Sequence, residues 1–124
     1  MTNNLLLFMT FVLAHHLSAQ TIPITSTSKK AIEHYETGWL LEDKLKLEEA
    51  EIHYRKALAI DSSFAMAHLR LGMVRDNYVN RREKINDALK YIDNVSQGEK
   101  LWILARQDFY SLEKDYAANC CNTA

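Results

Sequence analysis

The sequence has little that would interrupt a helix: of its 124 residues, only one is a proline and three are glycines. These two residue types carry the largest free-energy cost inside a helix, so their scarcity permits long helices with few breaks. The sequence also lacks an excess of charge of either sign, because 15 Lys and Arg residues are balanced by 16 Asp and Glu residues. This balance argues against nucleic acid as a partner, since nucleic-acid-binding domains usually show clustered positive charge.

Cysteine is scarce as well, and the two that occur, Cys120 and Cys121, are adjacent near the end of the sequence. Neighbouring cysteines can bridge each other only with strain, so we expect no disulfide that holds the fold. Two thiols without a second pair of ligands also make a poor zinc site. We interpret them as tail residues, with crosslinking between chains as the alternative.

The usual motifs of enzymes are absent from the sequence. It contains no glycine-rich phosphate loop, and no Ser–His–Asp or Cys–His arrangement in a recognisable context. His34, His53 and His68 lie outside the N-terminal segment, but a zinc site usually needs three or four converging ligands. We therefore predict that the chain is not an enzyme and has no metal and no cofactor, and that these histidines have structural or incidental roles.

Residues 1–19 differ in composition from the rest of the chain. The run Leu5–Leu17 is apolar except for Thr10, His15 and His16, and it is too short to cross a hydrocarbon core of about 30 Å as a helix. Such a run followed by the small residue Ala19 is typical of a secretory signal peptide. We expect cleavage after Ala19, no stable membrane span afterwards, and export to the periplasm or the medium. The alternative is an uncleaved segment that anchors the chain to a membrane.

The rest of the chain shows apolar residues at helical spacing and no alternating strand pattern, which predicts an all-α fold. A polar linker at residues 20–30 precedes a helix that starts at Ala31. The later helices are predicted at about 45–61, 64–77, 83–95 and 99–112, with a short sixth segment at 113–121.

Several polar residues stand where helices are expected to begin. Ser26, Thr27 or Ser28 can cap the first helix, because a hydroxyl accepts from the free backbone N–H groups of a helix start. Ser96 precedes Glu99 by three residues, which is the capping-box pattern, in which each side chain bonds the backbone N–H of the other residue. We expect this pair to open the helix that follows.

An internal repeat relates the first and third helices. When the chain is shifted by 34 residues, Ala31 falls on Ala65, His34 on His68 and Gly38 on Gly72. A helix–turn–helix unit of 34 residues is the period of the tetratricopeptide repeat. The chain resembles this family over about residues 31–112. The predicted helical domain is 31–124, with units at about 31–64 and 65–98 and a partial unit at 99–124. The second unit needs an insertion of about four residues near residues 78–83 to match the pattern.

The resemblance implies close packing at small residues. The family pattern has a small residue in the first helix of a unit, and alanine, an aromatic residue and alanine in the second. The matching positions are Gly38, Ala50, Tyr54 and Ala57 in the first unit, and Gly72 and Ala88 in the second. We therefore interpret Gly38 and Gly72 as packing residues that contact the second helix of their own unit.

The resemblance also implies an inner groove lined by the first helix of each unit. Its positions correspond here to Ile32, Tyr35, Trp39, Glu42, Asp43, Met66, Leu69, Met73, Asp76 and Asn77. Aromatic side chains often anchor interfaces, and methionine surfaces adapt to varied partners. We expect this groove to bind a peptide or helix of another protein, with basic residues facing the acidic edge. The alternative is that several of these side chains pack against neighbouring helices.

These features predict an exported helical-repeat protein that acts in protein–protein interaction or as a scaffold. The alternative is a helical accessory domain, or the remnant of a longer enzyme or sensor protein. The fifth helix is apolar at the consecutive positions Leu101–Ala105 and again at Phe109, Tyr110 and Leu112. A helix that is apolar on several sides is usually buried by neighbours on more than one side. The last helix of a repeat array, in contrast, normally has a polar outer face. We expect either cover by another chain, through self-association, or truncation of a longer repeat protein.

Overall fold

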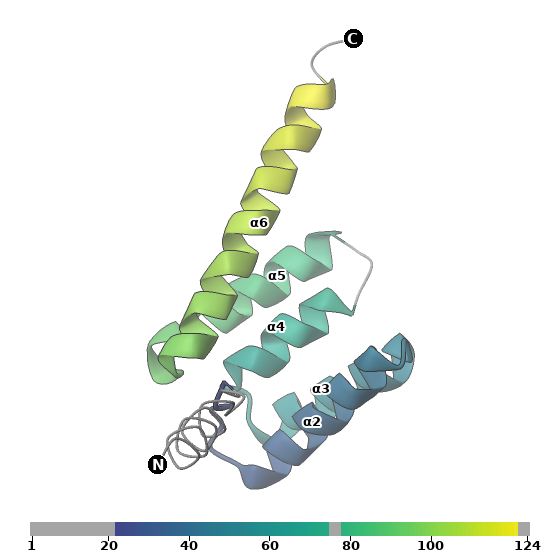
Figure 1. The fold of residues 1–124 in the computed structure, drawn as a ribbon, viewed down its shortest axis with the longest axis vertical. Coiled ribbons are helices and arrows are strands. Elements are labelled where there is room, and N and C mark those ends of the chain that lie inside the picture. The colour runs from purple at the N-terminus through teal and green to yellow at the C-terminus, as the bar shows by residue number, and fades with distance from the viewer. Residues whose placement is uncertain (1–21, 75–77, 122–124) are drawn as a thin grey trace, which may run out of the picture.

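The computed structural model describes residues 22–74 and 78–121, with side chains for 22–74 and 80–111, and every regular element in these ranges is helical. The elements are α2 (Lys29–Asp43), α3 (Leu47–Ile60), α4 (Ala65–Met73), α5 (Tyr78–Leu89), the 3-10 helix η1 (Ile92–Asn94) and α6 (Gln97–Cys121). The prediction of an all-α fold is confirmed. Helices α2 and α3 form one antiparallel pair, α4 and α5 form a second, and α6 packs beside them (Figure 1).

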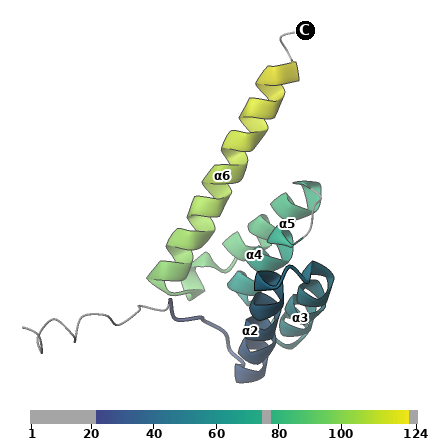
Figure 2. The ribbon, with the colours of Figure 1, turned by 45° about the vertical axis from the view of Figure 1, so that its right-hand side comes forward.

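Three helix boundaries differ from those predicted. α5 begins at Tyr78, before the predicted start at Glu83, because no proline or glycine between these residues stops the helix. It ends at Leu89 and not at Val95, since the following backbone tightens into η1. The predicted fifth helix and sixth segment are one continuous helix, α6, whose C-terminal half extends past the other helices (Figures 1 and 2).

The turn between α2 and α3 is closed by backbone hydrogen bonds. The Leu45 N–H donates to the Glu42 carbonyl at 2.9 Å, and the Lys46 N–H donates to the Leu41 carbonyl at 2.9 Å. This pattern is the Schellman motif, which turns a chain sharply at a helix C-terminus. Leu45 has a φ of 59° there, in the left-handed region that usually favours glycine, and its side chain is exposed.

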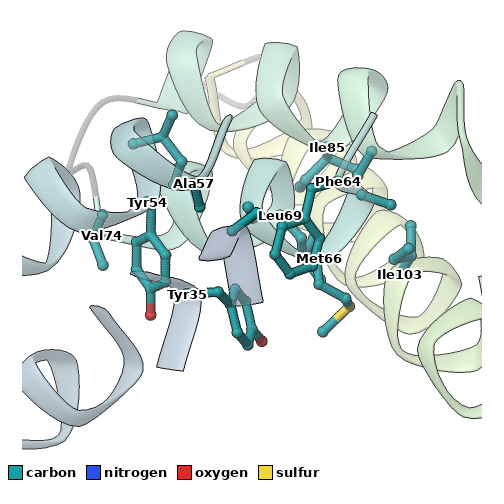
Figure 3. Packing of buried hydrophobic residues seen from close by; sticks show 14 of the residues in the cluster. Tyr35, Tyr54, Ala57, Phe64, Met66, Leu69, Val74, Ile85 and Ile103 are labelled. Carbon is teal, nitrogen blue, oxygen red and sulfur yellow. The ribbon is translucent and has the colours of Figure 1, made fainter. Parts of the chain in front are cut away.

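The core combines aromatic rings with small residues that let the helices approach. The Tyr35 ring of α2 lies 5.8 Å from the Tyr54 ring and 5.1 Å from the Phe64 ring, between ring centres. A Cβ atom at Gly38 would come within 2.8 Å of the Tyr54 ring, so this position requires glycine or a shift of the ring. Figure 3 shows Val74 and Tyr54 on one side of the cluster, Tyr35 near the middle and Ile103 of α6 on the other side.

Gly72 has the same packing role in the second pair. A Cβ atom at this position of α4 would lie 2.9 Å from Cβ of Lys84 and 3.2 Å from the backbone oxygen of Arg81, both on α5. Since backbone cannot move aside as the end of a long side chain can, this position requires glycine or a shift of α5. Ala88 of α5 is also fully buried.

Residues 22–28, which we call the N-terminal strap, are fixed by two buried carboxylates. The Glu99 carboxylate of α6 accepts hydrogen bonds from the Thr25 backbone N–H at 2.8 Å and the Thr25 hydroxyl at 2.6 Å. The Asp61 carboxylate, between α3 and α4, accepts from the Ser26 hydroxyl at 2.6 Å and the Thr27 N–H at 2.8 Å. Part of the predicted linker is therefore bonded both to the junction of α3 and α4 and to the start of α6.

The predicted caps are formed only in part. The capping box is confirmed, because the Ser96 N–H donates to Glu99 at 2.8 Å and the Glu99 N–H donates to the Ser96 hydroxyl at 3.4 Å. At the start of α2, Ser28 occupies the cap position but its hydroxyl makes no capping bond. The nearby Ser26 hydroxyl is instead directed to Asp61, which offers a stronger, charged acceptor.

The bonds to Asp61 predict a pH dependence of stability. Burial alone would raise the pKa of Asp61, but hydrogen bonds from Ser26, Ser63 and Thr27 outweigh burial and hold it well below the ordinary value of 3.8. The Asp61 carboxyl therefore binds a proton more tightly in the unfolded chain than in the folded one. Its contribution to the free energy of unfolding is complete above about pH 4 and declines as the pH falls further.

We expect Asp61→Asn to lower the free energy of unfolding by about 2–3 kcal/mol at neutral pH, because charge-assisted hydrogen bonds are lost. The difference from the parent should shrink as the pH is lowered from 5 towards 2, as measured by urea unfolding. Asp93→Asn is the matched control, because Asp93 is exposed and bonds only Lys100. A difference for Asp61→Asn that stays constant down to pH 2 would contradict this account.

Candidate interaction surface

The structure divides the predicted groove residues into buried and accessible ones. Tyr35, Met66 and Leu69 have at most 3% of their surface exposed, so they belong to the core and not to a free groove. The physical reason is that they pack in one core cluster with residues of α3, α5 and α6, as the alternative interpretation expected. Trp39 and Asp43 are exposed, Ile32, Glu42 and Met73 are partly exposed, and Asp76 and Asn77 lie outside the described residues.

Arg70 of α4 is the centre of the polar contacts on this side of the molecule. Its guanidinium group lies 5.6 Å from the ring centre of Trp39 and 5.4 Å from that of Trp102. Only 8% of Arg70 is exposed. These three residues come from α2, α4 and α6, and we call them the Trp–Arg–Trp cluster. The contacts place the cation against the faces of two aromatic rings, which attract it electrostatically.

Glu42 neutralises the buried cation. One of its carboxylate oxygens lies 3.2 Å from the Arg70 guanidinium, and the other accepts the Tyr54 hydroxyl at 2.6 Å. Burial raises the pKa of Tyr54, and the hydrogen bond and charge of Glu42 raise it further. Burial would lower the pKa of Arg70, but its interactions with Tyr35 and Glu42 outweigh that effect and raise it. Both carboxylate oxygens of Glu42 thus have partners within the molecule, and Glu42 contributes little to the predicted acidic edge of a groove.

Beside the Trp–Arg–Trp cluster, α6 carries an open depression of about 340 Å³. It is lined by Trp102, Ala105, Arg106 and Phe109. Phe109 is 58% exposed, and the guanidinium of Arg106 lies 5.9 Å from the Trp102 ring centre. Within the part of the chain whose side chains are described, Arg106 makes no ion pair. The depression therefore offers apolar rings and a positive charge that has no carboxylate partner among the described side chains.

The three histidines do not converge on one site. His68 packs its ring against Tyr91, with 6.0 Å between ring centres, and its Nε2 lies 2.9 Å from the Ser62 carbonyl oxygen. His34, its counterpart in the repeat, instead contacts His53 of α3. Among the described residues, no group of three or more His, Cys, Asp or Glu side chains could hold a metal ion.

Sequence reasoning missed Arg70, Trp102 and the lining of the depression. The position of Arg70 within the apolar stretch of α4 indicates that its charge is paired, because arginine is almost never fully buried unless it has a partner. Its partners lie on other helices, so spacing along the chain could not identify them.

Comparisons of the chain with protein-family models, curated proteins and solved structures find no significant match. None of the helices in the described ranges has the length and apolar character needed to cross a membrane.

We expect Glu42→Ala to lower the free energy of unfolding by about 3 kcal/mol, because it leaves the buried Arg70 charge and the Tyr54 hydroxyl without their acceptor. Urea unfolding at neutral pH measures this loss. Glu33→Ala, on the exposed side of α2, is the matched control and should change the free energy by less than about 0.5 kcal/mol. Equal effects of the two variants would show that the Glu42 contacts do not stabilise the fold.

Proposed function

We propose that the chain is an exported, tetratricopeptide-like interaction module that binds a peptide or helix of a partner protein over the Trp–Arg–Trp cluster and the depression on α6. The observation that carries this proposal is the chain of aromatic and arginine contacts that links the exposed Trp39 to the depression. Trp39 is 47% exposed and contacts Arg70, Arg70 contacts Trp102, and Trp102 lines the depression with Phe109. Aromatic and arginine side chains are the residues that most often contribute strongly to binding.

The charges on this surface indicate the chemistry of the partner. Glu42 already accepts from Tyr54 and Arg70, which weakens the case for a basic peptide. Arg106 is the charge at the depression that has no ion-pair partner among the described side chains. A partner segment with an apolar side chain next to a carboxylate fits this arrangement better, because opposite charges across an interface favour association and correct register.

Intrinsic fluorescence gives a direct test, since the chain has two tryptophans and both contact Arg70. We expect short synthetic peptides with leucine flanked by glutamates to change the tryptophan emission and to bind more tightly than the same peptides with lysines. Phe109→Ala and Arg106→Gln should each weaken this binding about tenfold, because each removes one contact in the depression.

The matched control for the peptide experiment is Leu45→Ala, because Leu45 is 84% exposed in the α2–α3 turn, away from the depression. It should leave the affinity unchanged. Tighter binding of the lysine peptides, or equal losses in all three variants, would contradict the proposed surface. Sedimentation at several protein concentrations distinguishes peptide binding from self-association through the exposed Leu101, Leu104 and Phe109 of α6.

Export is the second part of the proposal, and cleavage after Ala19 is compatible with the contacts of the strap. Ile22 of the strap lies against Gly98 near the start of α6. Removal of residues 1–19 would leave this contact and the bonds to Asp61 and Glu99 intact. Intact-mass measurement of the protein recovered from the cell envelope or medium should show a chain that begins at Gln20. A mass that includes residues 1–19 would support the membrane-anchored alternative instead.

A further inference from the structure

Helices α2 and α3 bring two histidines together on the first helix pair. Nδ1 of His34 lies 3.4 Å from Nδ1 of His53, and the ring centres are 5.4 Å apart with the planes tilted by 58°. Both side chains are partly exposed, so water and ions can reach them. Neither imidazole has another hydrogen bond within the described part of the chain. The two nitrogens therefore face each other with only a long mutual contact to satisfy them.

We propose that His34 and His53 bind one divalent transition-metal ion, such as Zn²⁺, between their Nδ1 atoms. Zinc–nitrogen bonds are about 2.0–2.1 Å long, so two nitrogens at a tetrahedral angle are about 3.3–3.4 Å apart. The observed separation of 3.4 Å equals this edge, so little movement of α2 or α3 is needed for both rings to bind the same ion.

The surroundings allow an exchangeable ion and not a permanent structural one. No third His, Cys, Asp or Glu of the described residues completes the site, so water must fill the remaining positions. Among the lysines and glutamates, Lys56 acts on His53 more strongly than Glu49, whose charge has the opposite sign. Imidazole ligands suit copper and nickel as well as zinc, and the affinity should follow the usual order, with Cu²⁺ above the other two.

An ion held here would join the two helices that carry Trp39 and Tyr54. Binding to the folded chain and not to the unfolded one raises the unfolding temperature, by an amount that grows with the metal concentration. His34 and His53 are adjacent only after α2 and α3 have paired, so the site requires the folded helix pair. The sequence comparison of His34 with His68 could not reveal this pairing.

Calorimetric titration with Zn²⁺ tests the proposal. The full chain is used with Cys120→Ser, Cys121→Ser, His15→Ala and His16→Ala, so that no other thiols or adjacent histidines compete. We expect one ion per chain, and a rise in unfolding temperature when the ion is added. His34→Gln and His53→Gln should each weaken binding about tenfold or more, because a single imidazole is a much weaker ligand than a pair. Glutamine keeps a hydrogen-bonding group, and thermal unfolding without metal checks that each variant folds.

His68→Gln is the matched control, because His68 lies outside the pair and contacts Ser62 and Tyr91. It should bind Zn²⁺ as the parent does. The proposal is overturned if the parent shows no saturable binding, or if loss of His68 weakens binding as much as loss of His34 or His53. It is also overturned if folded His34→Gln and His53→Gln variants bind as tightly as the parent.

Discussion

The carboxylate of Glu99 is the group on which the arrangement of the helices depends most. It is fully buried, and its two oxygens accept from the Thr25 N–H, the Thr25 hydroxyl and the Ser96 N–H. A buried carboxylate is tolerated only when such donors replace its water. One side chain thus caps α6 and holds the N-terminal strap, so the start of the last helix is fixed relative to the segment that leads into the first.

The same principle of paired burial produces the surface around Arg70. Arg70 can be buried because Glu42 and two tryptophan faces surround it, and Glu42 in turn receives the Tyr54 hydroxyl. This network uses the acidic group that would otherwise line a groove. What it leaves accessible is aromatic surface and the Arg106 cation of α6. The chemical character of the candidate site therefore follows from which charges the fold has already neutralised.

Local signals predicted what depends on nearby residues. Helical spacing predicted the all-α fold, and the pattern of Ser96 and Glu99 predicted the start of α6, because both act within a turn or two of helix. The early start of α5 and the unbroken α6 were missed because polar residues without glycine or proline do not end a helix. Burial of Tyr35 and the partners of Arg70 could not be predicted, since they depend on which helices pack together. The contact of His34 with His53 also depends on helix packing, so the sequence did not predict it. The 34-residue repeat instead aligns His34 with His68.

The strap has a consequence for the order of events as the chain is made. Thr25 and Glu99 are 74 residues apart, so the ribosome must add all of these residues before the bond can form. At about 5–20 residues per second, this takes roughly 4–15 s. Until then the segment before α2 lacks its anchor on α6, while its partner Asp61 is already present in the chain. The strap therefore gains its two anchors one after the other as the chain is made.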